Sequence, residues 1–192
     1  MQWITSFLTD RTQQVAYQGT LSKLQRLLYG VPQGSVLGPL LFNMYAADIS
    51  KVVESHGHKL HQYADDSQVY LTVPISEAAS AVDHFSHCVA DLSKWLSSSR
   101  LRLNPAKTLV IWLGGRQQVT SVKIGSVPVL SSTVTTVERA RDLGVVLDSQ
   151  LTMSAHVSSV CRSAYHQLRQ LRPINRSLSV DVAKMLDRKS VV

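Results

Sequence analysis

The order of apolar and polar positions divides the chain into helical and extended segments. Apolar residues recur every three or four positions over residues 76–96, which predicts a long amphipathic helix with Ser76 as its N-cap. The same spacing starts again at Ser154 and predicts a helix that ends at Pro173. Over residues 60–73 apolar and polar residues alternate instead. This alternation predicts two strands that are joined by a short turn.

Shorter patterns predict the elements between these segments. Residues 24–29 predict a strand that leads into a loop rich in glycine and proline, and Pro39 suits the first turn of the next helix. Residues 108–113 predict a strand, and residues 119–130 predict a hairpin that turns at Gly125. The other expected elements are a helix and turn over 4–15, a strand and turn over 14–21, a strand over 143–147 and a helix from 179. The order favours an α+β fold, with helices on one face of an antiparallel sheet.

Composition limits the class of protein. The chain has 192 residues, enough for one domain or for one domain and a piece of a second. No apolar run approaches the ~20 residues of a membrane span, and the first ten residues do not have the pattern of a signal peptide. Cys88 and Cys161 match no metal-ligand spacing and are expected to be reduced, buried thiols. We therefore expect an intracellular protein without a membrane partner; neither a nuclear or cytoplasmic location nor an oligomeric state can be predicted.

The chain is basic, with 20 Lys and Arg against 13 Asp and Glu and a net charge of +7. This excess favours a polyanionic partner, although a solvated basic surface would have the same composition. The basic residues gather in two stretches, Arg100, Arg102, Lys107, Arg116 and Lys123, and Arg162, Arg169, Arg172, Arg176, Lys184, Arg188 and Lys189.

Two motifs carry the most specific chemistry. The tetrapeptide Tyr63-Ala64-Asp65-Asp66 lies between the two predicted strands, so it would place adjacent carboxylates at a hairpin tip. Adjacent carboxylates repel unless a cation or a donor neutralises them, which suits a site for Mg²⁺ and phosphates. Asp-Asp also occurs in ordinary turns. About thirty residues upstream lies the second motif, Gly-Val-Pro-Gln-Gly, at residues 30–34.

These two motifs, in this order and at this distance, resemble the reverse transcriptase domain of non-LTR (LINE-type) retrotransposons. Four further segments resemble the same family, at residues 3–15, 101–108, 143–152 and 156–171. The resemblance implies a polymerase palm over residues 1–150 and the start of an α-helical thumb over residues 151–192. It implies RNA-directed DNA polymerase activity, with an RNA template, a DNA primer and deoxynucleoside triphosphates as partners.

The resemblance also implies roles for particular residues. Asp65 would bind catalytic metal and Asp66 would assist it, in a site for two Mg²⁺ ions or for Mn²⁺ as a substitute. Tyr63 would pack beneath the turn. The remaining expected site residues are Pro32, Gln33, Gly34 and Lys107 at the nucleotide and template, and Arg162, Arg169 and Arg172 at the nucleic-acid backbone.

The chain departs from the family pattern near its start. The family has a third carboxylate upstream of Gly-Val-Pro-Gln-Gly, but only 29 residues precede Gly30, and their one acid, Asp10, matches a later segment. We therefore expect a polymerase fragment truncated at both ends, with weak or no activity alone. Alternatives are a non-catalytic nucleic-acid-binding remnant and one part of a split polymerase. His56, His58 and His61 have no clear fourth partner and are not expected to bind metal.

Overall fold

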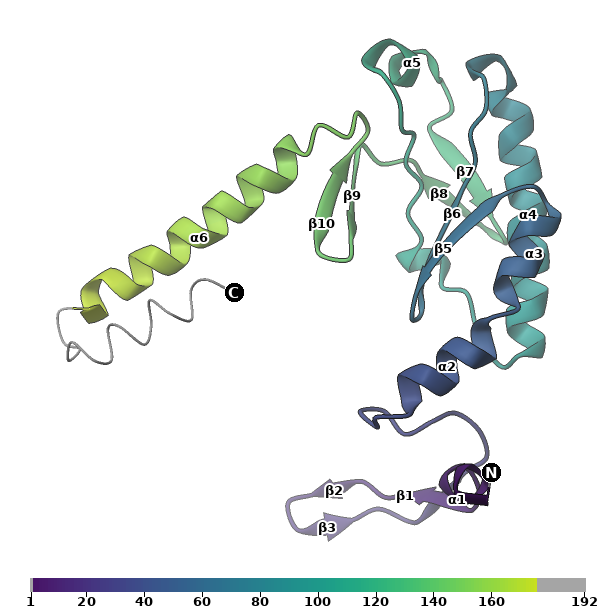
Figure 1. Ribbon diagram of the computed structural model, residues 1–192, viewed down its shortest axis with the longest axis vertical. Coiled ribbons are helices and arrows are strands. Elements are labelled where there is room, and N and C mark those ends of the chain that lie inside the picture. The colour runs from purple at the N-terminus through teal and green to yellow at the C-terminus, as the bar shows by residue number, and fades with distance from the viewer. Residues whose placement is uncertain (1, 176–192) are drawn as a thin grey trace. The chain divides into compact units, whose positions relative to one another are not determined.

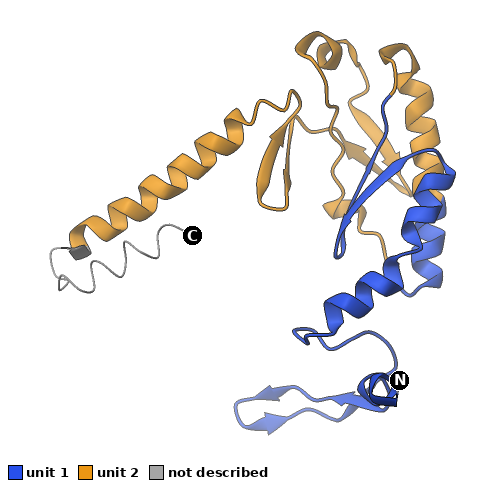
Figure 2. Cartoon of the chain, viewed as in Figure 1, with its two compact units in different colours: residues 1–72, 91–101 blue, residues 73–90, 102–192 orange. Residues whose placement is uncertain are grey.

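The computed structural model describes residues 2–175, which fall into two compact units (Figure 1 and Figure 2). The described residues of the first unit are 2–72 and 91–101, and those of the second are 73–90 and 102–175. The predicted helix from residue 179 lies outside the described residues. Helix α4 (Ala78–Ser98) contributes its first turns to the second unit and its last turns to the first.

The first unit begins with short elements at the N-terminus. Helix α1 (Gln2–Leu8) leads into β1 (Arg11–Gln13), which pairs antiparallel with β4 (Gln25–Leu27). Strands β2 (Ala16–Tyr17) and β3 (Thr20–Leu21) form a hairpin between them. Its two loop residues, Gln18 and Gly19, both have positive φ, the pattern of a type I′ turn. The turn predicted at Gly19 is confirmed.

Two helices and a hairpin complete the described first unit, apart from the end of α4. Helix α2 (Gly38–Ala46) has Pro39 in its first turn as predicted, and α3 (Ile49–Ser55) follows it. Strand β5 (Lys59–Tyr63) pairs antiparallel with β6 (Asp66–Tyr70). The buried apolar residues of this unit include Ile49 and Val53, both on α3, so the core lies against this helix.

The second unit has its core on α4 and one hairpin. Strand β7 (Ser126–Val129) pairs with β8 (Ser132–Thr135), and the buried residues of β7 are Val127 and Val129. Cys88 and Val89 of α4 are buried too, and the Ser86 hydroxyl of the same helix donates to the Pro128 carbonyl at 3.2 Å. The other elements are η1 (Ile75–Glu77), η2 (Pro105–Lys107), α5 (Arg116–Ser121), β9 (Arg139–Asp142), β10 (Val145–Asp148) and α6 (Ser154–Asn175).

The structure confirms a mixture of helices and antiparallel strands but not one continuous sheet. The named strands of the described residues pair two by two, as β1 with β4, β2 with β3, β5 with β6, β7 with β8 and β9 with β10. The predicted helix caps are also only partly right. Ser76 lies inside η1 and is not the N-cap of α4. Pro173 lies inside α6, since proline's φ is compatible with a helix and the hydrogen bond it removes is near the helix end.

The predictions for residues 108–130 were wrong in two places. Residues 108–113 form no named strand, and Val110 makes a single bridge with Thr136. Residues 119–121 belong to helix α5, because the Gln118 side chain accepts a hydrogen bond from the Gly115 backbone N–H at 2.8 Å and so caps the helix start. The hairpin therefore begins later and turns after Val129, where Leu130 has a φ of +56°.

The two cysteines differ in environment. Cys88 is buried in α4, as predicted, whereas Cys161 lies exposed on α6. The prediction for Cys161 assumed that the apolar face of this helix is buried. Most of the surface of α6 is exposed, so this face is not covered around Cys161.

Candidate functional site

The hairpin of β5 and β6 presents Asp65 and Asp66 at one tight turn. Tyr63 pairs with Asp66, which leaves Ala64 and Asp65 as a two-residue loop. Ala64 has a φ of +52°, and positive φ at the first loop residue alone is the pattern of a type II′ turn. Five residue pairs of the ladder and a 3.2 Å hydrogen bond from the Gln62 side chain to the Ala64 carbonyl hold this conformation.

Both carboxylates are exposed, so the turn can offer them to a ligand from solvent. Asp66 is the first residue of β6 and has its backbone held by the pairing with Tyr63, whereas Asp65 is a loop residue. Positive φ at an alanine costs on the order of 1 kcal/mol, a strain that proteins retain mainly where it serves a site. The predicted hairpin tip with two adjacent carboxylates is therefore present.

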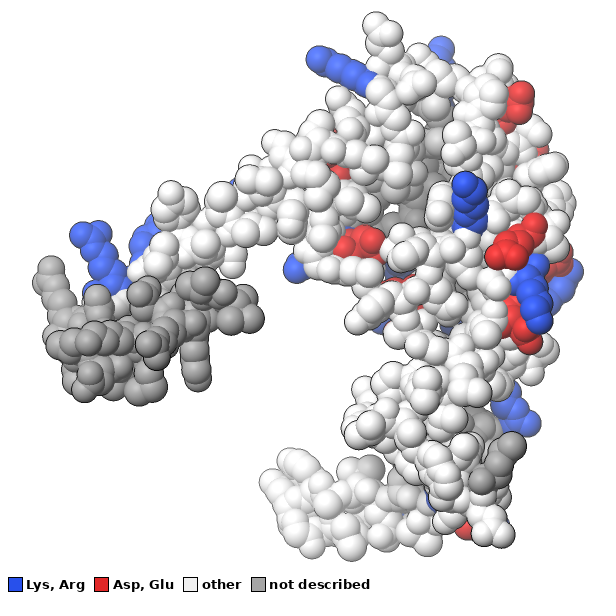
Figure 3. Space-filling view, viewed as in Figure 1, with Lys and Arg blue, Asp and Glu red and all other residues white. Residues whose placement is uncertain are grey.

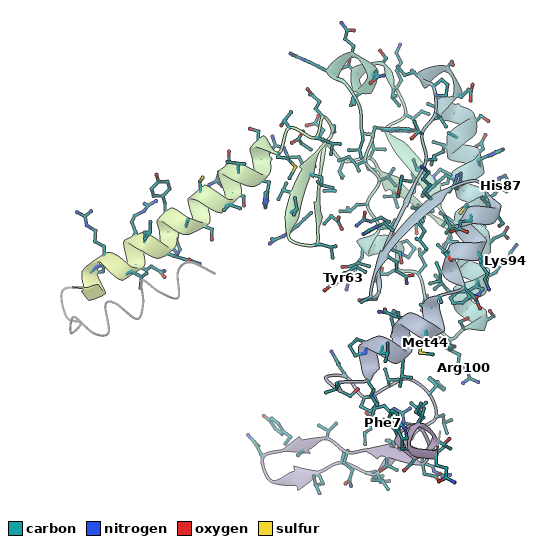
Figure 4. All side chains as sticks on the ribbon, in the orientation of Figure 1. Phe7, Met44, Tyr63, His87, Lys94 and Arg100 are labelled. Atoms are coloured by element: carbon teal, nitrogen blue, oxygen red, sulfur yellow. The ribbon has the colours of Figure 1, made fainter. Side chains whose placement is uncertain are left out.

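Tyr63 does not pack beneath the turn. Its side chain is 66% exposed at the end of β5 (Figure 4). Along this strand Leu60 and Gln62 are half-buried, while the alternate positions are exposed. Tyr63 falls on the exposed face because successive side chains of a strand point to opposite sides. The expectation of a ring beneath the turn was wrong for this arrangement.

The loop over residues 30–38 contains a second well-defined turn. The Ser35 N–H donates to the Pro32 carbonyl at 3.3 Å, and Gly34 has a φ of +79°, as in a type II turn. The Ser35 hydroxyl donates to the same carbonyl at 2.7 Å and accepts from the Gly38 N–H at 3.1 Å. This hydroxyl thereby ties the turn to the start of α2 and leaves Gln33 and Gly34 exposed.

Two arginines anchor the start of this loop. Arg11 donates from its guanidinium to the carbonyls of Gly30 and Leu8 and so joins the loop to the end of α1. Arg100 lies over the ring of Tyr29, with 4.7 Å between the guanidinium carbon and the ring centre. The sequence marked Arg100 only as a charge and did not single out Arg11, because the contacts of Arg100 with Tyr29 and of Arg11 with Gly30 join positions far apart in the chain.

Arg100 is positioned by the way α4 ends. It has a φ of +55°, its N–H donates to Ser97, and the next N–H, that of Leu101, donates to Leu96 at 2.7 Å. These two bonds and the left-handed residue form a Schellman motif. The Tyr45 hydroxyl of α2 donates to the Ser99 carbonyl at 2.7 Å, so the end of α4 is attached to α2 as well.

Lys107 lies in the second unit, at the end of the short helix η2. The Asn104 side chain caps this helix by accepting the Ala106 N–H at 3.1 Å. The backbone carbonyl of Asn104 accepts the Thr108 hydroxyl at 3.0 Å. The ammonium of Lys107 is exposed. The turn therefore holds the lysine backbone in place and leaves its charge open to an anion.

The three predicted backbone-contacting arginines lie exposed on α6, in the same unit. Basic groups on this helix are visible in Figure 3. Arg162 and Arg169 share a shallow hollow of about 410 Å³ with Ser159, Ser163 and His166. Arg172 follows Arg169 by three positions and so lies near it on the helix surface.

A cleft of about 440 Å³ separates α6 from the hairpin of β9 and β10. Its polar lining comes from Arg141 of the hairpin and from His156, Ser159, Ser163 and Gln167 of the helix. Sequence reasoning missed these residues. The packing of the hairpin on the helix brings Arg141 to the same cleft as the helix residues. No spacing of residues along the chain indicates this proximity.

Comparison with known proteins decides the family. The profile described as reverse transcriptase (RNA-dependent DNA polymerase) matches residues 1–147. This chain belongs to the reverse transcriptase family. The resemblance inferred from the two motifs is thus confirmed, and the match includes both the Asp65-Asp66 hairpin and the Pro32–Gly34 turn.

Named relatives of this reverse transcriptase chain come from mobile elements of Drosophila melanogaster. A probable RNA-directed DNA polymerase from transposon BS is 30% identical over 178 residues, which cover 88% of this chain and 19% of the relative. The RNA-directed DNA polymerase from mobile element jockey is 28% identical, and the probable one from transposon X-element is 32% identical, each over 82% of this chain and 17% of the relative. The chain therefore spans less than a fifth of these relatives, and no solved structure matches it.

Reverse transcriptases generally use divalent metal ions, and the Asp65-Asp66 turn fits part of such a site. Carboxylate oxygens are the ligands that Mg²⁺ prefers, and two exposed carboxylates occupy consecutive positions of this turn. Among residues 2–175, no group of three or more His, Cys, Asp or Glu side chains is gathered to hold a metal. The turn thus offers a partial ligand set, which substrate phosphates and water would have to complete.

The histidines of residues 56–61 are held by other interactions or are exposed. His56 of this cluster lies 3.1 Å from an Asp91 carboxylate oxygen, and His58 is buried. Lys94 at 2.8 Å and, more weakly, His56 lower the pKa of Asp91. No described helix is both long enough and apolar enough to cross a membrane.

Proposed function

We propose that this chain is the palm and the start of the thumb of an RNA-directed DNA polymerase from a non-LTR retrotransposon. Residues 1–150 would form the palm and residues 151–192 the first part of the thumb. The observation that carries the proposal is the two-residue turn that holds Asp65 and Asp66 exposed and adjacent within a region matched by the reverse transcriptase family. The antiparallel hairpins support a palm origin.

In the proposed reaction the 3′-hydroxyl of a DNA primer attacks the α-phosphorus of a deoxynucleoside triphosphate, and pyrophosphate leaves. Bound Mg²⁺ would supply Lewis acidity to the reacting oxygens. Asp65 would bind this metal and Asp66 would assist. Their charges would otherwise repel the phosphates, so metal binding and nucleotide binding are expected to depend on each other.

The loop over residues 32–34 is proposed to contact the nucleotide and the template base. Gly34 lacks a side chain and allows close approach of the backbone, and the exposed Gln33 amide can both donate and accept. Tyr63 lies exposed beside the carboxylates and can contact the primer end or the nucleotide there. Lys107, also exposed, is proposed to neutralise or protonate the triphosphate.

The surface of α6 is proposed to bind the backbone of the RNA–DNA duplex. Arg162, Arg169 and Arg172 would pair with phosphates, and Arg141 with Ser163 would extend the contact across the cleft. Such contacts are independent of sequence and weaken with salt. The binding constant of a hybrid duplex should therefore fall steeply as salt rises.

A second function, binding without catalysis, is favoured by one observation. The described residues gather no third acidic ligand at Asp65 and Asp66. Loss of one bridging ligand should cripple a two-metal site. We therefore expect the 192-residue polypeptide alone to polymerise weakly or not at all, and to retain duplex binding through α6.

Primer extension on an RNA template annealed to a DNA primer tests both functions. The native chain is compared with Asp65→Ala/Asp66→Ala in Mg²⁺ and in Mn²⁺, and Asp83→Ala, an exposed carboxylate of α4, is the matched control. Extension by the native chain and the control only would support the polymerase. Absence of extension in all three, with duplex binding retained, would support the binding function.

A further inference from the structure

The segment that joins β10 to α6 is held by a network of side-chain hydrogen bonds. We propose that Asp148 and Thr152 form a rigid joint that sets the direction of α6 against the β9–β10 hairpin, which makes Asp148 a positioning residue for the contacts of this helix with nucleic acid. The part about nucleic acid rests on the proposed function. The part about the direction of the helix does not.

One carboxylate organises the whole connection. Asp148 is the last residue of β10, and one of its oxygens accepts the N–H groups of Gln150 at 3.2 Å and Thr152 at 3.0 Å. Its other oxygen accepts the Thr152 hydroxyl at 3.0 Å. That hydroxyl in turn accepts the N–H of Ser154, the first residue of α6, at 3.3 Å. An unbroken series of hydrogen bonds therefore runs from the end of the strand to the start of the helix.

The backbone of the joint is strained in a way that these bonds explain. Leu151 and Met153 have φ values of +54° and +61°, in the left-handed region that side-chain-bearing residues rarely adopt. Each such residue costs on the order of 1 kcal/mol and persists only where its surroundings impose it. The two left-handed residues turn the chain sharply between β10 and α6. The joint therefore fixes the angle between the strand and the helix and is not a flexible link.

A second attachment lies within the first turn of α6. Val146 of β10 donates its N–H to Nδ1 of His156 on α6, at 3.3 Å. The helix packs chiefly against this strand, and beyond it several apolar side chains are exposed, with Val160 at 51% and Leu168 at 60%. Within the described part of the chain, the direction of α6 therefore depends on the joint, on this bond and on the packing against β10.

The length of α6 makes its direction important for binding. Its 22 residues span about 33 Å, at ~1.5 Å per residue. A change of about 15° at Ser154 would move Arg172 by about 7 Å, which is more than the reach of a hydrogen bond to a phosphate. The cleft lined by Arg141 and Ser163 would change width at the same time.

The direction of the helix can be measured with spin labels in the full chain. Cys161 is exposed on α6 and takes one label, while Cys88 is buried. Leu143→Cys takes the other, at an exposed hairpin position that already has a positive φ. We expect a narrow distance distribution that broadens at least twofold in Thr152→Val and in Asp148→Ala, which removes the carboxylate acceptors of the joint. The distribution should stay narrow in Thr152→Ser, which keeps the hydroxyl. Distributions in Thr152→Val and Asp148→Ala as narrow as the native one would overturn the joint.

A control and a binding measurement separate positioning from general stability. Thr133→Val, an exposed threonine of β8, should leave the distribution unchanged. In unlabelled chains, Thr152→Val should weaken binding of an RNA–DNA hybrid about fivefold, and should have no further effect once Arg162, Arg169 and Arg172 are replaced by Gln. Equal losses in both backgrounds would contradict the positioning role. If the native chain bound no hybrid, the proposed function would fail, and the label distances alone would still decide the joint.

Discussion

The guanidinium of Arg100 lies 4.7 Å above the ring centre of Tyr29, immediately before the Gly-Val-Pro-Gln-Gly loop. This stacking joins the end of α4 to the loop that is proposed to contact the nucleotide. Because Arg100 occupies the left-handed position of a Schellman motif, the backbone itself aims the side chain. A contact between residues 71 positions apart thus supports a motif that appears local in the sequence.

Removal of this cation–π contact should loosen the loop. Tyr29→Leu and Arg100→Gln are each expected to destabilise the chain, with a coupling free energy of about 0.5–1 kcal/mol in a double-mutant cycle, as exposed cation–π pairs contribute. Urea unfolding of the two single variants and the double variant measures this coupling. Additive effects would mean that the two side chains do not interact, and Arg100→Lys should retain part of the coupling.

Gly38 should tolerate no side chain. A Cβ atom there would lie 2.9 Å from the Ser35 hydroxyl and 3.3 Å from the Pro32 carbonyl, within the turn that leads into α2. Gly38→Ala is therefore expected to lower the unfolding free energy by about 1–3 kcal/mol, as overpacking does. Gly125→Ala is the matched control, because a Cβ atom there meets nothing within 4 Å and no positive φ applies. Equal melting temperatures for the two variants would contradict this account.

The stability of the β5–β6 turn should depend on which side chain stands at position 64. Ala64 has a φ of +52°, which β-branched residues disfavour strongly. Ala64→Val should lose roughly 1–2 kcal/mol of stability, whereas Ala64→Gly should be nearly neutral, because relief of strain offsets the larger entropy of unfolded glycine. Thermal unfolding of both variants tests this difference. A valine variant as stable as the native chain would show that the positive φ is not maintained in solution.

The two hairpin carboxylates should form the principal site for divalent ions. In the native chain, Mn²⁺ is expected to broaden the amide NMR signals of residues 63–66 before others, and excess Mg²⁺ should reverse the broadening. Asp65→Asn/Asp66→Asn should remove this effect, while Asp83→Asn should leave it intact. Broadening that persists in the double variant would place the ion elsewhere.

The joint predicts a specific change in the titration of Asp148. The Thr152 backbone N–H, with smaller contributions from its hydroxyl and from the Gln150 N–H, lowers the pKa of Asp148. A lowered pKa means that this carboxylate stabilises the fold above its ordinary titration range and that the contribution disappears as the pH falls through the lowered value. Thr152→Val should raise the pKa of Asp148 toward that range, as a carboxyl-carbon NMR titration would show. An unchanged titration would mean that the hydroxyl is not bonded to the carboxylate.

Local features of the fold were largely predictable from the sequence. The amphipathic period marked α4 and α6, and the alternation around Asp65-Asp66 marked the β5–β6 hairpin, because side-chain spacing and turn chemistry act within a few residues. The motifs around residues 30–34 and 63–66 were specific enough to predict the family, which the comparison confirmed.

Short segments between these elements were predicted less well. Val119 and Thr120 are β-branched and so favour a strand, but both join α5, because the Gln118 side chain caps the helix at Gly115. Over three or four residues the 3.6-residue period of a helix cannot be distinguished from the two-residue alternation of a strand. A single capping bond then decides between the two. The same ambiguity displaced the turn of the β7–β8 hairpin from Gly125 to Leu130.

The sequence by itself determined the family, the two catalytic-type motifs and the long helices, since each depends on residues close together in the chain. Only the tertiary structure decided which side chains support those motifs. Arg11 meets Gly30, Arg100 meets Tyr29 and His156 meets Val146 through contacts between separate elements. Such contacts depend on the directions that turns, caps and packed hairpins impose on the chain, and no spacing along the sequence encodes them.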